Sequence, residues 1–229
     1  MHKIVYNHIY NHNIGVNRMD DFEYKDECHQ EIAPKSIKQK NIVDAIISYL
    51  HDLVFLIAGV LLVFSLLFRV VVVSGPSMNN TLYDGDWLLL LGNILYGEPQ
   101  HGDIIVASKD SYDNGSPIIK RVIATEGQTV DIDFWKGVVY VDGEALDEPY
   151  TLTPTNIKEG MSFPLTVSEG CIFVMGDNRN LSKDSRSDQI GLIDCREVLG
   201  KAIFLVFPGD PDGQQGPKGR DLNRIGVVS

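Results

Sequence analysis

The sequence predicts a mostly β protein in which a single N-terminal transmembrane helix precedes a β-sandwich or barrel-like domain. An uncharged apolar run occupies residues 53–68. From Val70 onward, short β-branched and aromatic runs alternate with Gly, Pro, Asn and Asp, and no stretch has helical periodicity. With 229 residues, 44% hydrophobic and 22% charged, the chain can form one packed domain plus an appendage.

The first segment, residues 1–40, is predicted to be a disordered cytoplasmic tail. It is rich in Asn, His, Asp, Glu and Lys and shows little apolar periodicity. A segment of this composition cannot bury enough apolar surface to offset the chain entropy that folding removes.

Residues 41–73 are predicted to form a transmembrane signal anchor with its flanks. The uncharged run Leu53–Phe68 is slightly too short to cross a hydrocarbon core of about 30 Å as a helix. We expect extension backward into Ile46 or forward past Arg69 into Val70–Val73. The alternatives are a buried core helix and a cleavable signal peptide. A polar leader of about fifty residues is too long for the latter, and no Ala-x-Ala-like site follows.

The charges around this run predict its orientation. Lys35, Lys38 and Lys40 lie close on its N-terminal side, whereas only Arg69 lies close on the other side. Because positive residues stay in the cytoplasm, we expect a single-pass cell-membrane protein with a cytoplasmic N-terminus. Residues 74–229 would then form an extracytoplasmic β domain.

The β domain is expected to contain at least seven strands. The candidates are Trp87–Leu91, Asp103–Ser108, Ile118–Ala124, Thr129–Phe134, Val138–Val141, Cys171–Met175 and Ala202–Phe207. Hairpin turns are indicated at 135–137 and 142–143. The Gly/Pro/Asp-rich segment 209–220 is predicted to be an exposed loop before a last short strand, 225–228.

Charge and cysteine content exclude two classes of partner. The net charge of −11 argues against nucleic acid, because Lys and Arg supply most of the binding free energy to phosphates. Cys28, Cys171 and Cys195 have no metal-ligand spacing, so we expect neither zinc nor another metal. Cys171 and Cys195 would both lie outside the cytoplasm, where either a disulfide or two buried free thiols would be compatible with the sequence.

Ser77 is a candidate nucleophile because of the turn that holds it. The turn Ser74-Gly-Pro-Ser-Met78 follows the apolar run by a few residues. A Gly-Pro turn would hold the hydroxyl outward near the bilayer surface. The alternative is an ordinary turn serine, which is the more frequent case for so short a motif.

Lys120 is a candidate general base. Apolar residues of both parities flank it in Pro117–Ala124, so we expect both faces of the strand to be covered and the amine to be desolvated. Burial lowers the pKa of an amine, and a neutral amine can accept a serine proton near neutral pH. The alternative is an edge-strand lysine whose amine reaches water.

The polar segment Gly176–Arg186 is the third candidate. It follows the apolar strand Cys171–Met175 and carries closely spaced donors and acceptors. Such a segment is either a solvated turn or a fixed network beside an active site.

These three segments, with the sequence Gly-Asp-Ile-Ile-Val at 102–106 between the first two, resemble the bacterial type I signal peptidases, or leader peptidases. The resemblance runs in the family's order from Ser74 to the segment Leu222–Gly226. It implies a membrane-bound serine endopeptidase with a Ser/Lys dyad and no cofactor. Such an enzyme removes signal peptides from exported preproteins, cutting after small residues at positions −1 and −3.

Carried over to this sequence, the resemblance makes Ser77 the nucleophile and Lys120 the base. Ser182 would hydrogen-bond and orient the Lys120 amine. The Ser77 backbone N–H would hold the oxyanion. Gly75 stands where some relatives have a serine that supplies a second donor, so that donor is unidentified here. Asn80 stands where many relatives have proline.

The resemblance also implies supporting residues and a two-part fold. Met78 would line the site, and Asp184, Arg186 and Arg121 would be structural partners that shape the polar loop. The family's fold is a two-part β domain with an apolar surface against the membrane, and about residues 127–170 would be the inserted second part.

The implied partners are preprotein signal peptides, a phospholipid membrane and the protein-export machinery. One rival hypothesis is a self-cleaving Ser/Lys repressor, which would carry a DNA-binding module in place of the membrane segment. The others are an anchored β domain that binds exported proteins without cleaving them, and a dedicated processor of the subunits of one surface polymer. A lysine in the base position, where relatives of the endoplasmic reticulum are expected to have histidine, indicates a bacterial enzyme.

Overall fold

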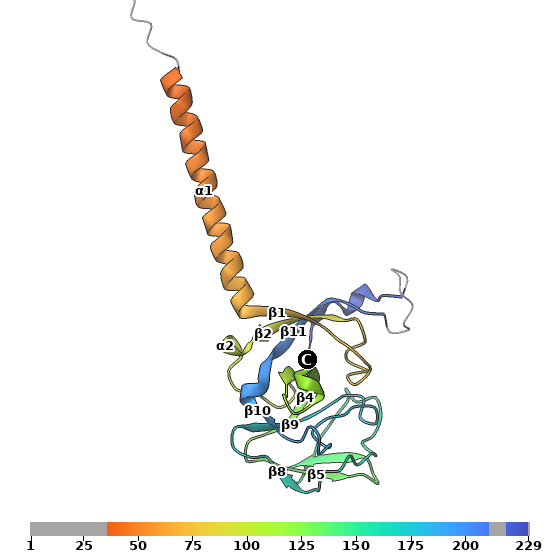
Figure 1. Ribbon diagram of the computed structural model, residues 1–229. Helices are drawn as coiled ribbons and strands as arrows, with labels where there is room; N and C mark the ends of the chain where they lie inside the picture. Colours follow the sequence, from red (N-terminus) through yellow and green to blue (C-terminus); the bar gives the residue numbers. More distant parts are fainter. Residues whose placement is uncertain (1–35, 211–218, 229) are drawn as a thin grey trace, which may run out of the picture. The chain divides into compact units, whose positions relative to one another are not determined.

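The computed structural model describes residues 36–210 and 219–228 (Figure 1). Residues 1–35 of the predicted tail, Cys28 among them, and residues 211–218 of the predicted loop lie outside this range. The chain divides into two units, residues 1–51 and 52–229. In the first, the described residues are helical; the second contains the rest of that helix and all the strands.

Helix α1, Ser36–Leu67, contains the predicted membrane segment. Its portion Asn41–Leu67 has a mean hydropathy of 2.4 and is long and apolar enough to cross a membrane. The helix starts well before Leu53, so the expected backward extension is confirmed. The forward extension is wrong, because Phe68–Val72 is strand β1, which pairs with β2, Trp87–Gly92, in five antiparallel residue pairs (Figure 1). A run rich in β-branched valines favours that sheet edge over another turn of helix.

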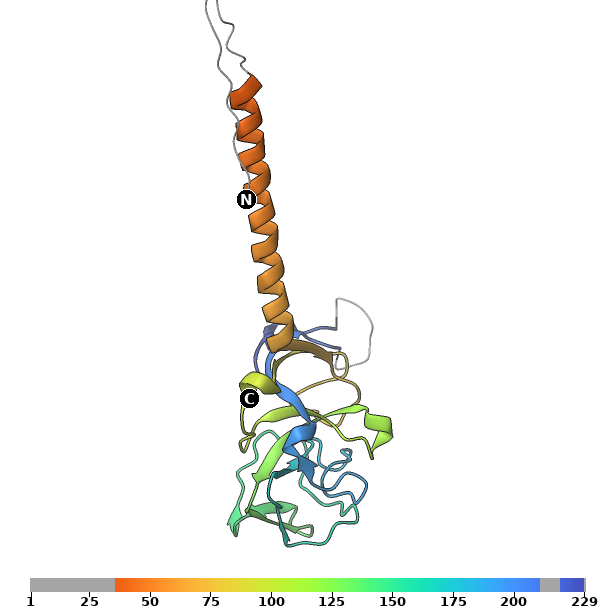
Figure 2. The ribbon, with the colours of Figure 1, turned by 60° about the vertical axis from the view of Figure 1, so that its left-hand side comes forward.

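The larger sheet joins strands from the beginning and the end of the domain. Its order is β1-β2-β11-β3-β4-β9-β10, with β12 paired to β11. In Figures 1 and 2, β11 lies beside β2, as the antiparallel register requires. The remaining strands of this sheet are β3 Ile104–Ser108, β4 Pro117–Thr125, β9 Cys171–Met175, β10 Ile193–Asp194, β11 Val198–Phe207 and β12 Gly226–Val227.

The smaller sheet has the order β7-β6-β5-β8. Its strands are β5 Thr129–Asp133, β6 Val138–Val141, β7 Glu144–Ala145 and β8 Leu165–Thr166. Both predicted hairpin turns are present. Asp142 and Gly143 have φ values of 52° and 85°, and a two-residue type I′ hairpin turn requires positive φ at both positions. At Gly137, a Cβ atom would lie 2.4 Å from Pro154, so only glycine fits that turn.

The seven predicted strands are all present, with ends that differ by a few residues at most. The predicted last short strand, 225–228, is present as β12. The other two-residue strands and a single helical turn were not predicted, because elements this short have too few residues to show a period. The helical one is α2, Asn93–Tyr96, which corrects the expectation of no helix beyond Val70. Three 3₁₀ turns also occur, at Asp113–Gly115, Cys195–Glu197 and Leu222–Arg224.

Three buried clusters form the core, and they settle the state of the two cysteines. Asp194 pairs with Cys171 across β9 and β10, so Cys195 is one residue from the partner position. Cys171 nevertheless packs with the cluster that contains Phe173, and Cys195 packs with the cluster that contains Ile172. Because Ile172 and Phe173 are consecutive in β9, they face opposite sides of the sheet, and so do the two cysteines. Both are free thiols.

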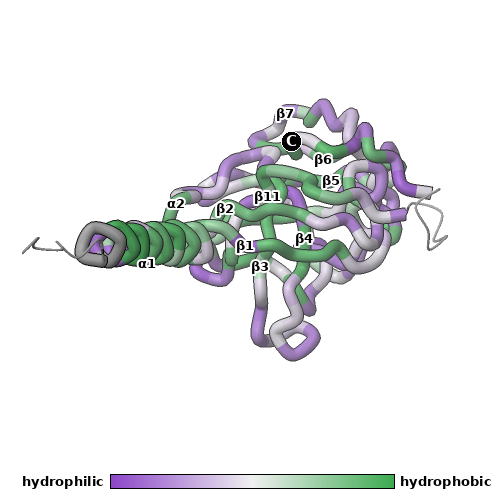
Figure 3. The backbone as a smooth tube through the Cα atoms, turned by 90° about the horizontal axis from the view of Figure 1, so that it is seen from above, coloured by the Kyte–Doolittle hydropathy of each residue, from purple (hydrophilic) through white to green (hydrophobic). Residues whose placement is uncertain are grey.

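One face of the larger sheet is apolar and open. Residues of β1, β2, β11 and β12 that alternate with the core positions point outward there, and Figure 3 shows hydrophobic colouring along β1, β2 and β11. We call this surface the outer apolar face; its most exposed members are Val70, Val72, Trp87, Phe207 and Val227. An apolar surface of this kind marks a contact with a partner or a membrane.

Candidate active site

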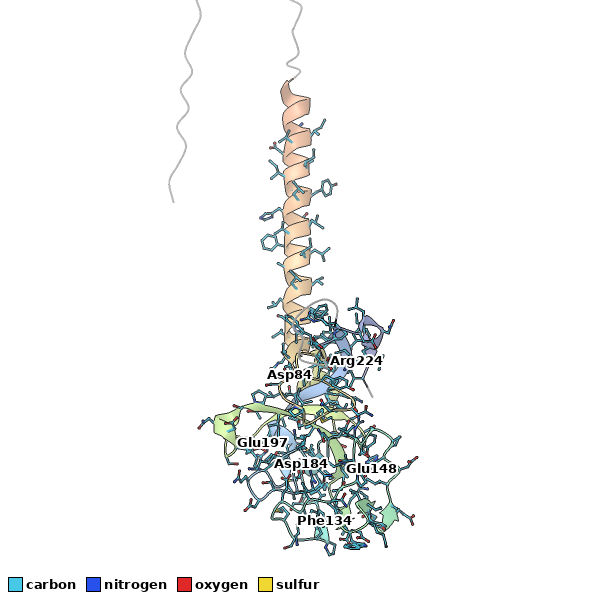
Figure 4. All side chains as sticks on the ribbon, turned by 90° about the vertical axis from the view of Figure 1, so that its right-hand side faces the viewer. Asp84, Phe134, Glu148, Asp184, Glu197 and Arg224 are labelled. Atoms are coloured by element: carbon cyan, nitrogen blue, oxygen red, sulfur yellow. The ribbon has the colours of Figure 1, made fainter. Side chains whose placement is uncertain are left out.

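Ser77 lies in a turn, residues 74–86, that joins β1 to β2. Gly75 has φ +83° and its N–H donates to the Asp84 carboxylate at 2.7 Å. Further along, the buried Asp86 accepts both Arg224 nitrogens at 2.9 and 2.6 Å. Asp84 and Arg224 lie at the same end of the β domain (Figure 4). Contacts at both ends of the turn therefore fix the backbone around Ser77.

Lys120 reaches Ser77 from the middle of β4. Its Nζ donates to Ser77 Oγ at 2.9 Å and to the Ile119 carbonyl at 2.9 Å. Lys120 is only 4% exposed, which agrees with the prediction of a strand covered on both faces. The hydroxyl and the amine thus share one hydrogen bond in a nearly dry environment.

Burial lowers the pKa of Lys120 to about 8. The carboxylates of Asp184, Asp177 and Glu159 oppose this effect by favouring the ammonium, and Arg186 adds to it. With this pKa, a large fraction of the Lys120 amine is unprotonated at mildly alkaline pH, as a general base requires.

The loop after β9 binds the Ser77 turn directly. Asn178 N–H donates to the Ser77 carbonyl at 3.1 Å, and Asn178 Nδ2 donates to the Pro76 carbonyl at 3.1 Å. Asp177 accepts two hydrogen bonds from Arg121, at 2.9 and 2.8 Å. Because Arg121 follows Lys120 in β4, this buried pair holds the strand and the loop together.

Asp184 and Arg186 form a second buried pair. Arg186 Nε and Nη2 each donate to Asp184 at 2.8 Å, and Asp184 accepts the Gly176 N–H at 3.0 Å. The two residues thus contact each other within the polar loop. Arg121, however, pairs with Asp177 and not with these two residues, so the supports form two separate ion pairs.

The hydrogen bond expected between Ser182 and Lys120 is absent. Ser182 is 1% exposed, and its Oγ has no hydrogen-bond partner in the described part of the chain. The Lys120 amine instead points to Ser77 and to its own strand. The Ser182 hydroxyl is therefore a buried polar atom held beside the pair without contacting it.

Gly176 explains how these segments come so close together. A Cβ atom there would lie 2.1 Å from Ser182 Oγ and 2.4 Å from the Ser77 carbonyl oxygen. Only a glycine permits both contacts. Gly176 and Asp177 were not among the predicted site residues. A glycine followed by an acid, directly after a buried strand, was the sequence signal that pointed to them.

A small apolar cavity opens beside the pair. It has a volume of about 130 Å³, and Ser77, Lys120 and Met78 are among its lining residues, as expected for Met78. The other lining residues are mostly aliphatic: Val71, Val72, Val73, Ser74, Val106, Pro117, Ile118 and Ile119. Among residues 36–210 and 219–228, no three His, Cys, Asp or Glu side chains gather as a metal site would require.

Comparison with known proteins identifies the class first. A family model described as signal peptidase, peptidase S26, matches residues 46–207. The chain is a serine peptidase, and the loop between β1 and β2 holds a serine that is hydrogen-bonded to a buried lysine of β4.

More narrowly, the chain belongs to the signal peptidase I family. It is 34% identical to signal peptidase I of Bacillus licheniformis over 76% of this chain and 94% of that protein. It is 39% identical to probable signal peptidase I-1 of Synechocystis over 69% of this chain and 83% of that protein. A crystal structure of a signal peptidase I from Enterococcus faecalis is 31% identical and covers 46% of this chain and 97% of that one, with a TM-score of 0.38.

Proposed function

We propose that this signal peptidase acts through Ser77 as nucleophile and Lys120 as general base. The observation that carries the proposal is the 2.9 Å contact between Lys120 Nζ and Ser77 Oγ, made by an amine whose pKa burial lowers to about 8. Removal of signal peptides from preproteins is the activity of the family; the dyad is the means we assign to it here.

In the proposed reaction, the neutral Lys120 amine takes the Ser77 proton as the hydroxyl oxygen attacks the scissile carbonyl. The C–N bond then breaks, and the lysinium gives its proton to the leaving amine. Water, deprotonated by the same amine, hydrolyses the acyl-enzyme and restores the free hydroxyl. Arg121 and Asp177 hold β4 and the polar loop in place through these steps without transferring protons.

The Ser77 backbone N–H is the proposed first oxyanion donor. It has no acceptor in the described part of the chain, so it is free to bind a substrate oxygen. One such preorganised donor contributes about 3 kcal/mol in comparable hydrolases. At Gly75, a Cβ atom would meet nothing within 4 Å, so this side of the site is open to solvent or substrate.

The cavity beside the pair supports a preference for small residues at positions −1 and −3. Its mainly aliphatic walls suit a small apolar side chain, and a pocket of this kind selects among apolar side chains by size. An extended substrate would run along β1 or β4, whose backbones border the cavity, and main-chain hydrogen bonds would set its register.

Membrane attachment is the second part of the proposal. Helix α1 has the length and hydropathy of a transmembrane segment, and the outer apolar face adds exposed side chains on β1, β2, β11 and β12. We assign the membrane as the partner of both. Lys35, Lys38 and Lys40 favour a cytoplasmic N-terminus and an extracytoplasmic β domain, where the export machinery delivers preproteins. When the layers of the cell envelope outside the cell membrane have been removed, added protease should digest the β domain. If the β domain stays protected in such cells, the proposed orientation is wrong.

The catalytic assignment is tested with purified full-length protein in detergent and a preprotein reporter. Ser77→Ala and Lys120→Ala should each abolish release of the mature product, and the double variant should be no worse, because residues acting as a unit are not additive. Lys136→Ala, an exposed lysine in the turn between β5 and β6, is the control and should cleave normally. Near-normal turnover by Lys120→Ala rules out the dyad. Binding of the reporter without cleavage by the wild type would instead indicate a silent binding module.

A further inference from the structure

Glu159 lies in the segment that joins β7 to β8, residues 146–164. Neighbouring residues hold it there: Gly160 pairs with Ser187, and Met161 N–H donates to the Arg186 carbonyl at 3.0 Å. Glu159 lines the same cavity as Ser182, with a volume of about 450 Å³. The Glu159 carboxylate therefore lies beside the polar loop, in the same cavity as Ser182.

The environment of Glu159 is poorly suited to a carboxylate. Its side chain is 19% exposed, and its Oε2 is buried without a hydrogen-bond partner in the described residues. Arg186 Nη2 lies 3.8 Å from Oε1, beyond hydrogen-bond distance. The same Arg186 already donates two hydrogen bonds to Asp184, so it cannot neutralise both acids.

The charged groups around Glu159 act in both directions. Burial raises its pKa, and the Asp184 carboxylate raises it further. Arg186, Lys183 and the Asp184 backbone N–H lower it. Asp188 is also close, since a Cβ atom at Gly160 would lie 3.4 Å from the Asp188 carboxyl carbon. Two acids thus share one buried arginine, and one negative charge remains.

The remaining charge lies near the catalytic pair, because Glu159 and Ser182 line one cavity and a Cβ atom at Gly176 would contact both Ser182 and the Ser77 carbonyl. The Glu159 carboxylate is among the groups that favour the Lys120 ammonium, together with Asp184 and Asp177. The latter two acids are each balanced by a bidentate arginine, Arg186 and Arg121. We propose that Glu159 is a positioning residue whose charge, exerted beside the Asp184–Arg186 pair, sets the lower pH limit of peptidase activity. This inference rests on the proposed role of Lys120 as base.

The test compares Glu159→Gln with two controls in full-length protein. Glu159→Asp keeps the charge, and Glu169→Gln removes the same charge at an exposed turn. Because removing a negative charge weakens the preference of Lys120 for the ammonium, Glu159→Gln should shift the midpoint of the acidic limb of kcat/KM down by about half a pH unit. The high-pH plateau should stay unchanged, so kcat/KM at pH 7 should rise about threefold. Both controls should keep the wild-type midpoint.

A second readout separates this inference from the catalytic assignment. In the Ser77→Ala background, the rate at which a small acylating reagent modifies the Lys120 amine is measured against pH. Glu159→Gln should shift that midpoint downward by the same amount, and an unmoved midpoint overturns the inference. If the labelling midpoint moves and the cleavage profile does not, Lys120 is not the base. Should the Gln variant fail to fold, Glu159→Ser makes the same charge change with less bulk.

Discussion

Lys120 shows how much a single buried amine costs and what it provides. Moving its pKa from 10.5 to about 8 corresponds to about 3 kcal/mol of lost preference for the ammonium. The fold tolerates this cost because the amine still makes two hydrogen bonds, to Ser77 Oγ and to the Ile119 carbonyl. The same cost supplies the chemistry, since an ordinary lysine would be protonated at the pH where the enzyme must work.

The first prediction concerns pH. Because the proposed base must be unprotonated and its pKa is about 8, about one tenth of the enzyme is competent at pH 7 and nearly all of it at pH 9. We expect kcat/KM for a preprotein reporter to rise about tenfold across this interval. A profile that stays flat between pH 7 and 9 would contradict the assignment.

The second prediction concerns Gly176→Ala. The new methyl group would overlap Ser182 Oγ and the Ser77 carbonyl, so the loop and the Ser77 turn must move apart. Displacement of about 1 Å is expected to lower kcat by about 100-fold. Gly226→Ala is the control, because a Cβ atom there meets nothing within 4 Å. Equal activity of both variants would show that the close approach is not needed.

The candidate residues were predictable from sequence to different degrees. Ser77 and Lys120 could be named because a Gly-Pro turn and a two-sided apolar strand are local patterns. The pairing of Arg121 with Asp177, and the isolation of the Ser182 hydroxyl, depend on how a loop folds back over a strand 56 residues earlier in the chain. No local pattern in the sequence encodes that arrangement.

At the scale of elements, the boundary between α1 and β1 has the largest practical consequence. Leu67 ends the helix, and the next five residues form the edge strand that pairs with β2. Hydropathy alone could not find this boundary, because both an apolar helix and a sheet strand accept valine. The hydrogen-bonding partner, β2, comes fifteen residues later and decides the matter.

The third prediction follows from this boundary. A fragment of residues 68–229 should fold, whereas residues 74–229 should be less stable by about 2 kcal/mol or more, because Val71 and Val73 leave the core and β2 loses one of its two strand partners. Urea unfolding followed by circular dichroism measures the difference. Equal midpoints would mean that β1 contributes nothing to the domain.

The fourth prediction concerns the clamp formed by Asp86 and Arg224. Arg224→Met leaves the buried Asp86 carboxylate without its ion pair and is expected to lower the free energy of unfolding by about 3 kcal/mol. Cleavage should also slow, because Arg224 holds the Thr81 carbonyl of the Ser77 turn. The matched control is Arg196→Met, which breaks a pair whose arginine is 89% exposed and should cost under about 1 kcal/mol. Similar losses in both variants would argue against the clamp.

At the scale of the molecule, the strand alternation predicts which surface is open, but not what covers it. The mostly β fold class followed directly from the short apolar runs and turn residues. The order of the strands could not be predicted in this way. Strand β11 lies between β2 and β3, although it is separated from both by about ninety residues or more in the sequence. The outer apolar face is a product of that order.

The fifth prediction tests this face in the 68–229 fragment. Replacing the exposed Val72 and Val227 with Asp should reduce co-sedimentation with phospholipid vesicles several-fold, because a charge opposes burial of the face among lipids. Leu181→Asp, at a site 70% exposed on the polar loop, should leave vesicle binding unchanged. Undiminished sedimentation of the double variant would show that the face does not contact lipid.

Arg224 and Asp86 are separated by 138 residues, and this distance has a consequence for the order of events during synthesis. The serine emerges early, yet the turn that presents it stays unfinished until the far segment arrives and docks. A growing copy of the enzyme therefore holds its nucleophile in an incompletely braced turn. We expect it to cut its own chain or a neighbouring preprotein more slowly until nearly the whole domain has been made.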